Sequence, residues 1–132
     1  MASGLTVVDS TVLVDILRGQ PSAGEFARAL ESRMVASEVT RVEIMRGLRS
    51  AERSAAERLF RGLRWVPVDE SIARRAGELG RRWRNTHRQI SLSDLIVAAT
   101  AQDLGAQLAT SNVSHFPMFA GLMAPYAPAP AQ

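Results

Sequence analysis

Three acidic side chains stand where chemistry could be done jointly. Asp9 ends the apolar run 5–8, and Asp94 directly precedes the apolar run 95–99. Glu43 lies near the start of a segment with helical spacing. Carboxylates beside apolar runs are partly desolvated, which is costly unless a cation compensates their charge. Because hard oxygen ligands suit Mg²⁺ or Mn²⁺, the three acids are candidate ligands of such an ion.

Each of these acids also has a purely structural explanation. Asp9 can cap a helix that starts near Thr11, since aspartate is a favoured N-cap residue. Segments 40–43 and 91–94 have the spacing of capping boxes, and acids in first turns favour the helix dipole. The apolar settings of Asp9 and Asp94 favour a metal site over simple caps.

The elements that would position these acids alternate between strand and helix. Apolar and β-branched runs predict strands at 5–8, 34–36, 65–68 and 107–110. Periodic apolar positions predict helices at 11–18, 22–31, 40–50, 51–62, 71–84 and 95–104. This alternation predicts an α/β fold of three layers, a mostly parallel central sheet with helices on both faces. Polar residues that follow strands, including Asn112 and His115 after the last one, should then meet at one edge.

Composition narrows both the organisation and the chemistry. The 132 residues suit one domain, placed at 1–123, with a Pro/Ala-rich tail at 124–132. There is no cysteine, and all sixteen basic residues are arginine. The missing lysine excludes phosphotransfer sites of the receiver-domain and haloacid-dehalogenase types, which need one. Neither a signal peptide nor a membrane span is evident, so a cytoplasmic protein is expected.

A group of arginines surrounds Trp83 and His87. Its members are Arg74, Arg75, Arg81, Arg82, Arg84 and Arg88. Guanidinium groups beside an aromatic ring can bind phosphates and stack on unpaired bases. The alternative is a solvated helix face, which is common for charged runs. Four of these residues are taken as weak candidates for RNA binding: Arg81, Arg82, Arg84 and Arg88.

Four segments together resemble PIN-domain ribonucleases, and most closely the VapC-type toxins of toxin–antitoxin pairs. They are 7–14 (VVDSTVLV), 40–48 (TRVEIMRGL), 93–101 (SDLIVAATA) and 108–116 (LATSNVSHF). The resemblance covers nearly all of residues 5–117 in the family's order and spacing. It implies a PIN fold and cleavage of RNA by an endoribonuclease that uses Mg²⁺ or Mn²⁺.

The resemblance also implies roles for individual residues. Asp9, Glu43 and Asp94 match the family's three acidic positions, and Ser10 or Thr11 matches the small polar position beside the first. Many relatives carry a fourth acid where this chain has Asn112 or His115. Asn112 is therefore expected to hydrogen-bond an aspartate or a phosphate oxygen, with His115 in support. Occupancy of a second metal site stays open.

Partners follow from the resemblance as well. It implies an RNA substrate, a cognate antitoxin that covers the acidic site, and a homodimer. Phe26, Met45 and Trp83 are the candidate residues for the interface between copies. The alternative is a catalytically inactive PIN-like protein that binds RNA or a partner through its basic face, without cleaving.

Overall fold

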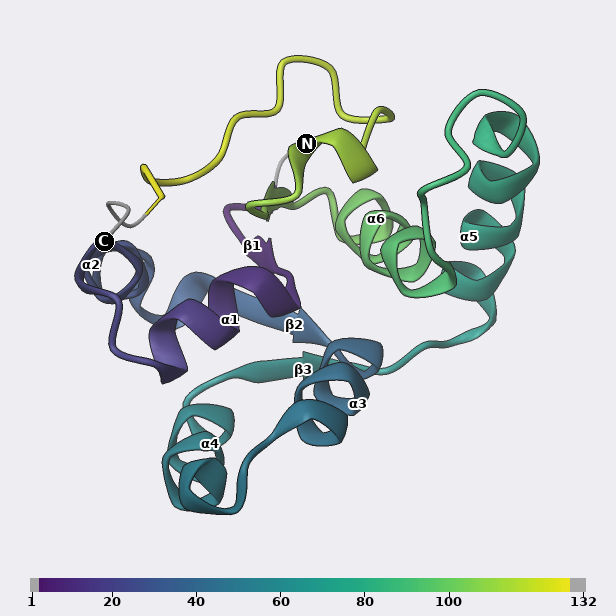
Figure 1. Ribbon diagram of the computed structural model, residues 1–132. Helices are drawn as coiled ribbons and strands as arrows, with labels where there is room; N and C mark the ends of the chain where they lie inside the picture. The colour runs from purple at the N-terminus through teal and green to yellow at the C-terminus, as the bar shows by residue number, and fades with distance from the viewer. Residues whose placement is uncertain (1–2, 129–132) are drawn as a thin grey trace.

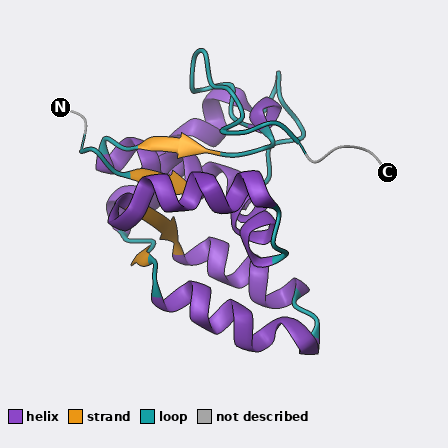
Figure 2. Ribbon diagram, turned by 90° about the vertical axis from the view of Figure 1, so that its left-hand side faces the viewer, coloured by secondary structure: helices purple, strands orange, loops and turns teal. Residues whose placement is uncertain are grey.

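A four-stranded parallel sheet forms the centre of the computed structural model, which describes residues 3–128. The strands are β1 (Thr6–Val8), β2 (Met34–Ser37), β3 (Arg64–Val66) and β4 (Gln107–Ala109). Their order across the sheet is β3-β2-β1-β4, each neighbouring pair is parallel, and Figure 2 shows the strands in orange. Because all strands are parallel, their carboxyl ends lie at one edge of the sheet.

Helices cover both faces of this sheet, so the predicted three-layer α/β architecture is confirmed. They are α1 (Ser10–Leu17), α2 (Pro21–Leu30), α3 (Glu38–Gly47), α4 (Arg53–Arg61), α5 (Glu70–Trp83) and α6 (Leu92–Leu104). Short 3₁₀ turns occur at Glu31–Arg33, Ser50–Glu52 and Val113–His115. In Figure 1, α1 and α2 lie on one side of the strands, and α6 with α5 beyond it lies on the other.

The core follows the alternation of side chains along the central strands. In β1, Val8 packs toward α1, α2 and α4, while Val7 packs toward α6. In β2, Ala36 joins the first cluster and Val35 the second. Successive side chains of a strand point to opposite faces, so a two-sided buried strand must be apolar throughout. This explains why the run 5–8, before Asp9, does not alternate regularly between apolar and polar residues.

Two predicted boundaries were wrong in an informative way. Helix α3 begins at Glu38, because the Ser37 hydroxyl accepts from the Val39 amide and caps it. Thr40, the expected first residue, is buried inside the helix. The predicted helix 51–62 begins instead with a 3₁₀ turn and becomes α-helical at Arg53. Short polar residues compete as caps, so spacing alone does not decide which one starts a helix.

The chain after the last 3₁₀ turn is irregular but packed as far as it is described. In Figure 1 it runs back across the molecule toward α2. There the Tyr126 ring lies 6.1 Å from that of Phe26, and the Tyr126 hydroxyl donates to Asp15 at 2.7 Å. The boundary between domain and tail after residue 123 stays a prediction, and its last residues, 129–132, lie outside the described part. No described helix is long and apolar enough to cross a membrane.

Candidate functional site

Asp9 lies at the carboxyl end of β1 and is the N-cap of α1, as expected. Its Oδ1 accepts from the Thr11 amide at 2.7 Å and from the Thr11 hydroxyl, and its Oδ2 accepts from the Thr110 hydroxyl. Only 5% of the residue is exposed. Burial raises the pKa of Asp9 above its ordinary value, although the hydrogen bonds from Thr11 and Thr110 oppose that rise. A cation beside this carboxylate would relieve the cost of keeping it charged.

The segment that follows β4 is tied to Asp9 through these hydroxyls. Thr11 Oγ1 accepts from the Ser111 amide at 3.0 Å, and Thr110 Oγ1 accepts from the Asn112 amide at 3.0 Å. Asn112 thus reaches Asp9 through its backbone and Thr110. Its exposed side chain makes no recorded hydrogen bond within residues 3–128. The side-chain amide of Asn112 is therefore available to bind a ligand.

Glu43 projects toward the start of α6. Its Oε2 accepts from the Ser93 hydroxyl at 3.0 Å, and the residue is half-buried. Since α3 starts at Glu38, Glu43 lies in the second turn, and the predicted capping box at 40–43 was wrong. A carboxylate outside the first turn has no free backbone amide to cap. The capping explanation for Glu43 is thereby removed.

Asp94 occupies the third position of α6, and here the capping box is confirmed. The Ser91 hydroxyl accepts from the Asp94 amide, while Asp94 Oδ2 accepts from the Ser91 amide at 2.9 Å. Asp94 Oδ2 also lies 3.0 Å from Nδ1 of His115. Asp94 is thus both a cap and the partner of a histidine from the segment after β4.

These contacts form two groups at the same edge of the sheet. One links Glu43 and Asp94, through Ser93 and the first turn of α6; the other links Asp9 to the segment after β4. Within residues 3–128 no three acidic or histidine side chains lie close enough to hold one ion jointly. The donor set nevertheless fits a hard divalent cation, since it offers three carboxylates and no sulfur. The Ser91 amide and His115 both contact Oδ2 of Asp94, and no hydrogen bond within residues 3–128 engages its Oδ1.

Two supporting residues escaped prediction. Thr110 has a signal in the register, because Val8 pairs with Ala109 and the next residues, Asp9 and Thr110, stand side by side. Ser93 has none, since its contact depends on how α3 packs against α6. The hydroxyl of Ser10, the alternative to Thr11, makes no hydrogen bond within residues 3–128.

Of the predicted arginine group, Arg74 and Arg75 form ion pairs with Glu70 and Asp103, and the other four members lie at the C-terminal end of α5. Arg81 and Arg82 are in its last turn, Arg84 is its C-cap, and Arg88 is in the following loop. All four are exposed, and none forms an ion pair within the part of the chain described. Their guanidinium groups are therefore open to an anionic ligand.

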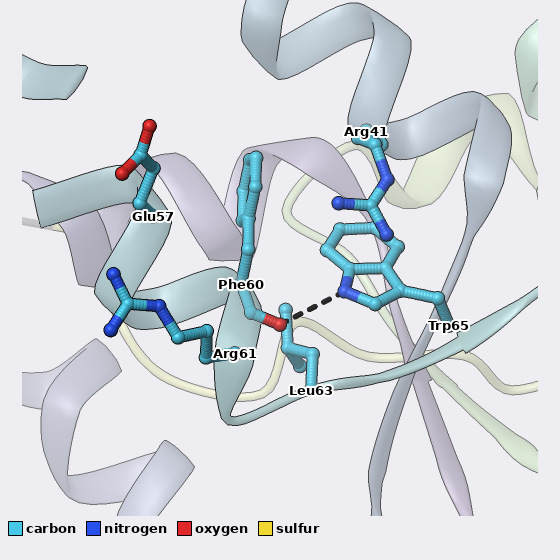
Figure 3. A pocket seen from close by; sticks show the side chains of 6 residues that line it. All are labelled: Arg41, Glu57, Phe60, Arg61, Leu63 and Trp65. Carbon is cyan, nitrogen blue, oxygen red and sulfur yellow. Dashed lines mark hydrogen bonds between the residues drawn. The ribbon is translucent and has the colours of Figure 1, made fainter. Parts of the chain in front are cut away.

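A shallow hollow between α3, α4 and β3 is a separate feature. The Arg41 guanidinium lies 4.0 Å from the Trp65 ring centre, and the Trp65 indole donates to the Phe60 carbonyl (Figure 3). Glu38 pairs with Arg41 at 2.6 Å. Cation–π stacking and this ion pair occupy the arginine. The guanidinium beside the aromatic rings of this hollow is therefore already engaged.

Comparison with known proteins agrees with this geometry. The PIN domain family model matches residues 6–118. Two proteins of Mycobacterium tuberculosis, Ribonuclease VapC19 and Ribonuclease VapC10, are each 42% identical over 125 residues. The alignments cover 92% of this chain and 100% of VapC19, and 93% and 94% for VapC10.

A solved toxin–antitoxin complex from Klebsiella pneumoniae has the same fold. It superposes with a TM-score of 0.75 at 24% identity, covering 92% of this chain and 98% of that one. At this identity the likeness concerns the fold alone. The match to the family model and the 42% identity to the two ribonucleases do not depend on this structural likeness. The chain therefore belongs to the PIN domain family and, within it, to the VapC group.

Proposed function

We propose that the chain is an endoribonuclease that cleaves RNA phosphodiester bonds with the help of Mg²⁺, for which Mn²⁺ can substitute. The observation that carries the proposal is the buried Asp9 carboxylate at the edge where Glu43 and Asp94 also lie. A buried charge of this kind is costly and calls for a cation. The two relatives named as ribonucleases support RNA as the substrate.

Asp9, Asp94 and Glu43 are the residues that would hold the ion. A divalent cation held there would lower the pKa of a bound water and would stabilise charge on the phosphate. Thr11 and Thr110 keep the Asp9 carboxylate fixed, which limits the reorganisation needed on binding. One ion is the simpler assignment, because the fourth polar position is an amide, Asn112, rather than an acid.

The remaining groups handle the proton and the phosphate. Glu43 Oε2 is engaged by Ser93, so Oε1 is left to accept a proton from the attacking water. Asn112 would donate from its side-chain amide to a phosphate oxygen. His115 uses Nδ1 toward Asp94 and has Nε2 left for the phosphate or the leaving oxygen. His115 is proposed as a supporting group that positions Asp94.

The decisive experiment compares two aspartates of the same helix. Asp94→Asn should lower the rate of Mg²⁺-dependent RNA cleavage by about 100-fold or more, the usual scale for such groups. Asp103→Asn is the matched control, because Asp103 lies on α6 but pairs with Ser71 and Arg75. Full cleavage by Asp94→Asn would refute the proposal. RNA binding that persists in EDTA, without any cleavage in Mg²⁺, would favour the alternative of an inactive binding protein.

We further propose that the enzyme acts as the toxin of a toxin–antitoxin pair and dimerises. The Klebsiella neighbour, a toxin–antitoxin complex, supports an antitoxin partner. We place that partner over the acidic edge, where it would block access to Asp9, Glu43 and Asp94. Of the predicted interface residues, Met45 is 55% exposed beside Val42, at 62%, on α3. Phe26 instead packs against Tyr126, and Trp83 is half-buried. The exposed pair on α3 is thus the better candidate for contact between copies.

A further inference from the structure

A mainly apolar cavity of about 280 Å³ lies outside the acidic site. It is enclosed by the end of α5, the loop after it and the start of α6. Its lining residues are Gly80, Arg81, Trp83, Arg84, His87, Ile90 and Leu95. Small-molecule sites start at roughly 300 Å³, so this cavity suits one flat ring rather than a peptide segment.

Along the chain, the cavity lining adjoins the segment that carries Asp94. Two of its apolar residues, Ile90 and Leu95, stand on either side of the Ser91–Asp94 capping box. The same loop is fixed to the segment after β4, because Gln89 Nε2 donates to the Ser114 carbonyl at 3.2 Å. An RNA chain with one nucleotide bound in this cavity would therefore run close to Asp94.

The chemistry of the lining matches a nucleobase with its phosphate. The Trp83 indole N–H is buried and has no acceptor among residues 3–128. His87 stands edge-on to the Trp83 ring, with their centres 5.2 Å apart. A base has a flat apolar face to pack there and carbonyl or ring-nitrogen acceptors at its edge. Arg81 and Arg84 line the cavity without an acidic partner in the described part and can bind phosphate.

We propose that this cavity is a nucleobase subsite, in which one base of the RNA substrate packs against Trp83 while Arg81 and Arg84 bind its phosphate. The inference rests on the proposed ribonuclease function and deepens it. Ile90 and Leu95 then select among bases by shape, so the cavity determines which position of an RNA is presented to the acids.

The test uses Trp83 as its own reporter. The chain has two tryptophans, so Trp65→Phe leaves Trp83 as the only source of indole fluorescence. The probes are the four nucleoside 5′-monophosphates, added in EDTA so that no metal-dependent step contributes. At least one should quench Trp83 saturably, whereas ribose 5-phosphate, which lacks a base, should not. Quenching by none, or equal quenching by ribose 5-phosphate, would overturn the proposal.

Variants separate the two halves of the subsite. Arg84→Gln should weaken monophosphate binding about tenfold, the effect of losing one charge-assisted hydrogen bond, but spare the phosphate-free nucleoside. Arg74→Gln is the matched control, since Arg74 lies on the same helix, pairs with Glu70 and does not line the cavity. Ile90→Phe should abolish quenching by filling the space. Equal binding by Arg84→Gln and Arg74→Gln would count against the subsite, whatever Ile90→Phe does to folding.

Cleavage assays distinguish this inference from the proposed function. If the subsite selects the base, Ile90→Phe should change which positions of a long RNA are cut and raise KM more than it lowers kcat. Unchanged cleavage positions would refute the subsite while leaving the ribonuclease intact. Nucleotide binding without cleavage by the wild type would refute the ribonuclease and leave the subsite standing. A change in Trp83 fluorescence with protein concentration, in the absence of any nucleotide, would show that a second copy of the chain covers the cavity. That result would overturn the proposal.

Discussion

Asp9 owes its position to two threonines that have different origins. Thr11 comes from the helix that Asp9 caps, so its contact is local. Thr110 directly follows the neighbouring strand β4, about a hundred residues away along the chain, and is fully buried. Their hydroxyls supply hydrogen bonds that partly replace the water lost by burial. At this scale the site is a buried carboxylate whose lost hydration is partly replaced by donors from α1 and from the residue after β4.

The Thr110 hydroxyl can be removed with little change in shape. Thr110→Val should lower the free energy of unfolding by about 1.5–3 kcal/mol near neutral pH, because the lost bond served a charged group. The measurement is denaturant unfolding in EDTA. Thr100→Val is the control, since the equally buried Thr100 hydroxyl donates only to the Ile96 carbonyl of its own helix. An equal cost for both variants would contradict the role assigned to Thr110.

The pH dependence of that cost has a defined sign. Burial raises the pKa of Asp9, so the folded state keeps this proton at pH values where the unfolded chain has lost it. Stability from this group is therefore greatest in acid and falls as pH rises through the raised pKa. The difference between Thr110→Val and the wild type should shrink as pH falls, because a neutral carboxyl needs the hydroxyl less. A constant difference would contradict this.

At the scale of elements, the sequence predicted most of what depends on local pattern. Buried strands such as β1 show as unbroken apolar runs, and the Ser91–Asp94 box fixes the start of α6. The start of α3 was placed two residues late, since Ser37 and Thr40 are both acceptable caps and tertiary burial of Thr40 decides between them. The Glu43–Ser93 contact depends on packing between helices, which no local pattern encodes.

The C-terminal segment is the element whose packing the sequence did not predict, and Tyr126 reports on it. Burial, together with the hydrogen bond to Asp15 and its charge, raises the pKa of Tyr126 well above the ordinary value. Since this is the only tyrosine, phenolate absorbance follows it directly. The titration should have its midpoint above that of free tyrosine, and Asp15→Asn should lower the midpoint. Stability should fall as pH rises above about 10, the unfolded-state value.

A phenylalanine at the same position provides the control for this titration. Tyr126→Phe keeps the ring against Phe26 but should remove the alkaline loss of stability. It should also cost about 1 kcal/mol at neutral pH for the lost hydrogen bond. An ordinary titration midpoint in the wild type would show that this segment is not held against α1 and α2 in solution.

For the molecule as a whole, charge is distributed to suit its proposed substrate. The formal net charge is only +3, yet every basic residue is an arginine. The acids that would hold the ion are engaged by hydroxyls, amides or a histidine, whereas the arginines at the end of α5 have no described ion pair. Arginine presents a planar fork that fits phosphate. On the proposed function, RNA would meet these arginines near the start of α6, without strong overall basicity.

This arrangement predicts how RNA affinity should respond to salt. Each phosphate contact to single-stranded RNA contributes about 0.7 to the slope of log affinity against log salt concentration. Arg82→Gln and Arg88→Gln lie outside the cavity lining and should each reduce the slope by about that amount, measured in EDTA with a short unstructured RNA. Arg53→Gln, an exposed arginine at the start of α4, should leave the slope unchanged. Only contacts that release counterions affect this slope. If all three variants had the same slope, the end of α5 would not be the surface that binds RNA.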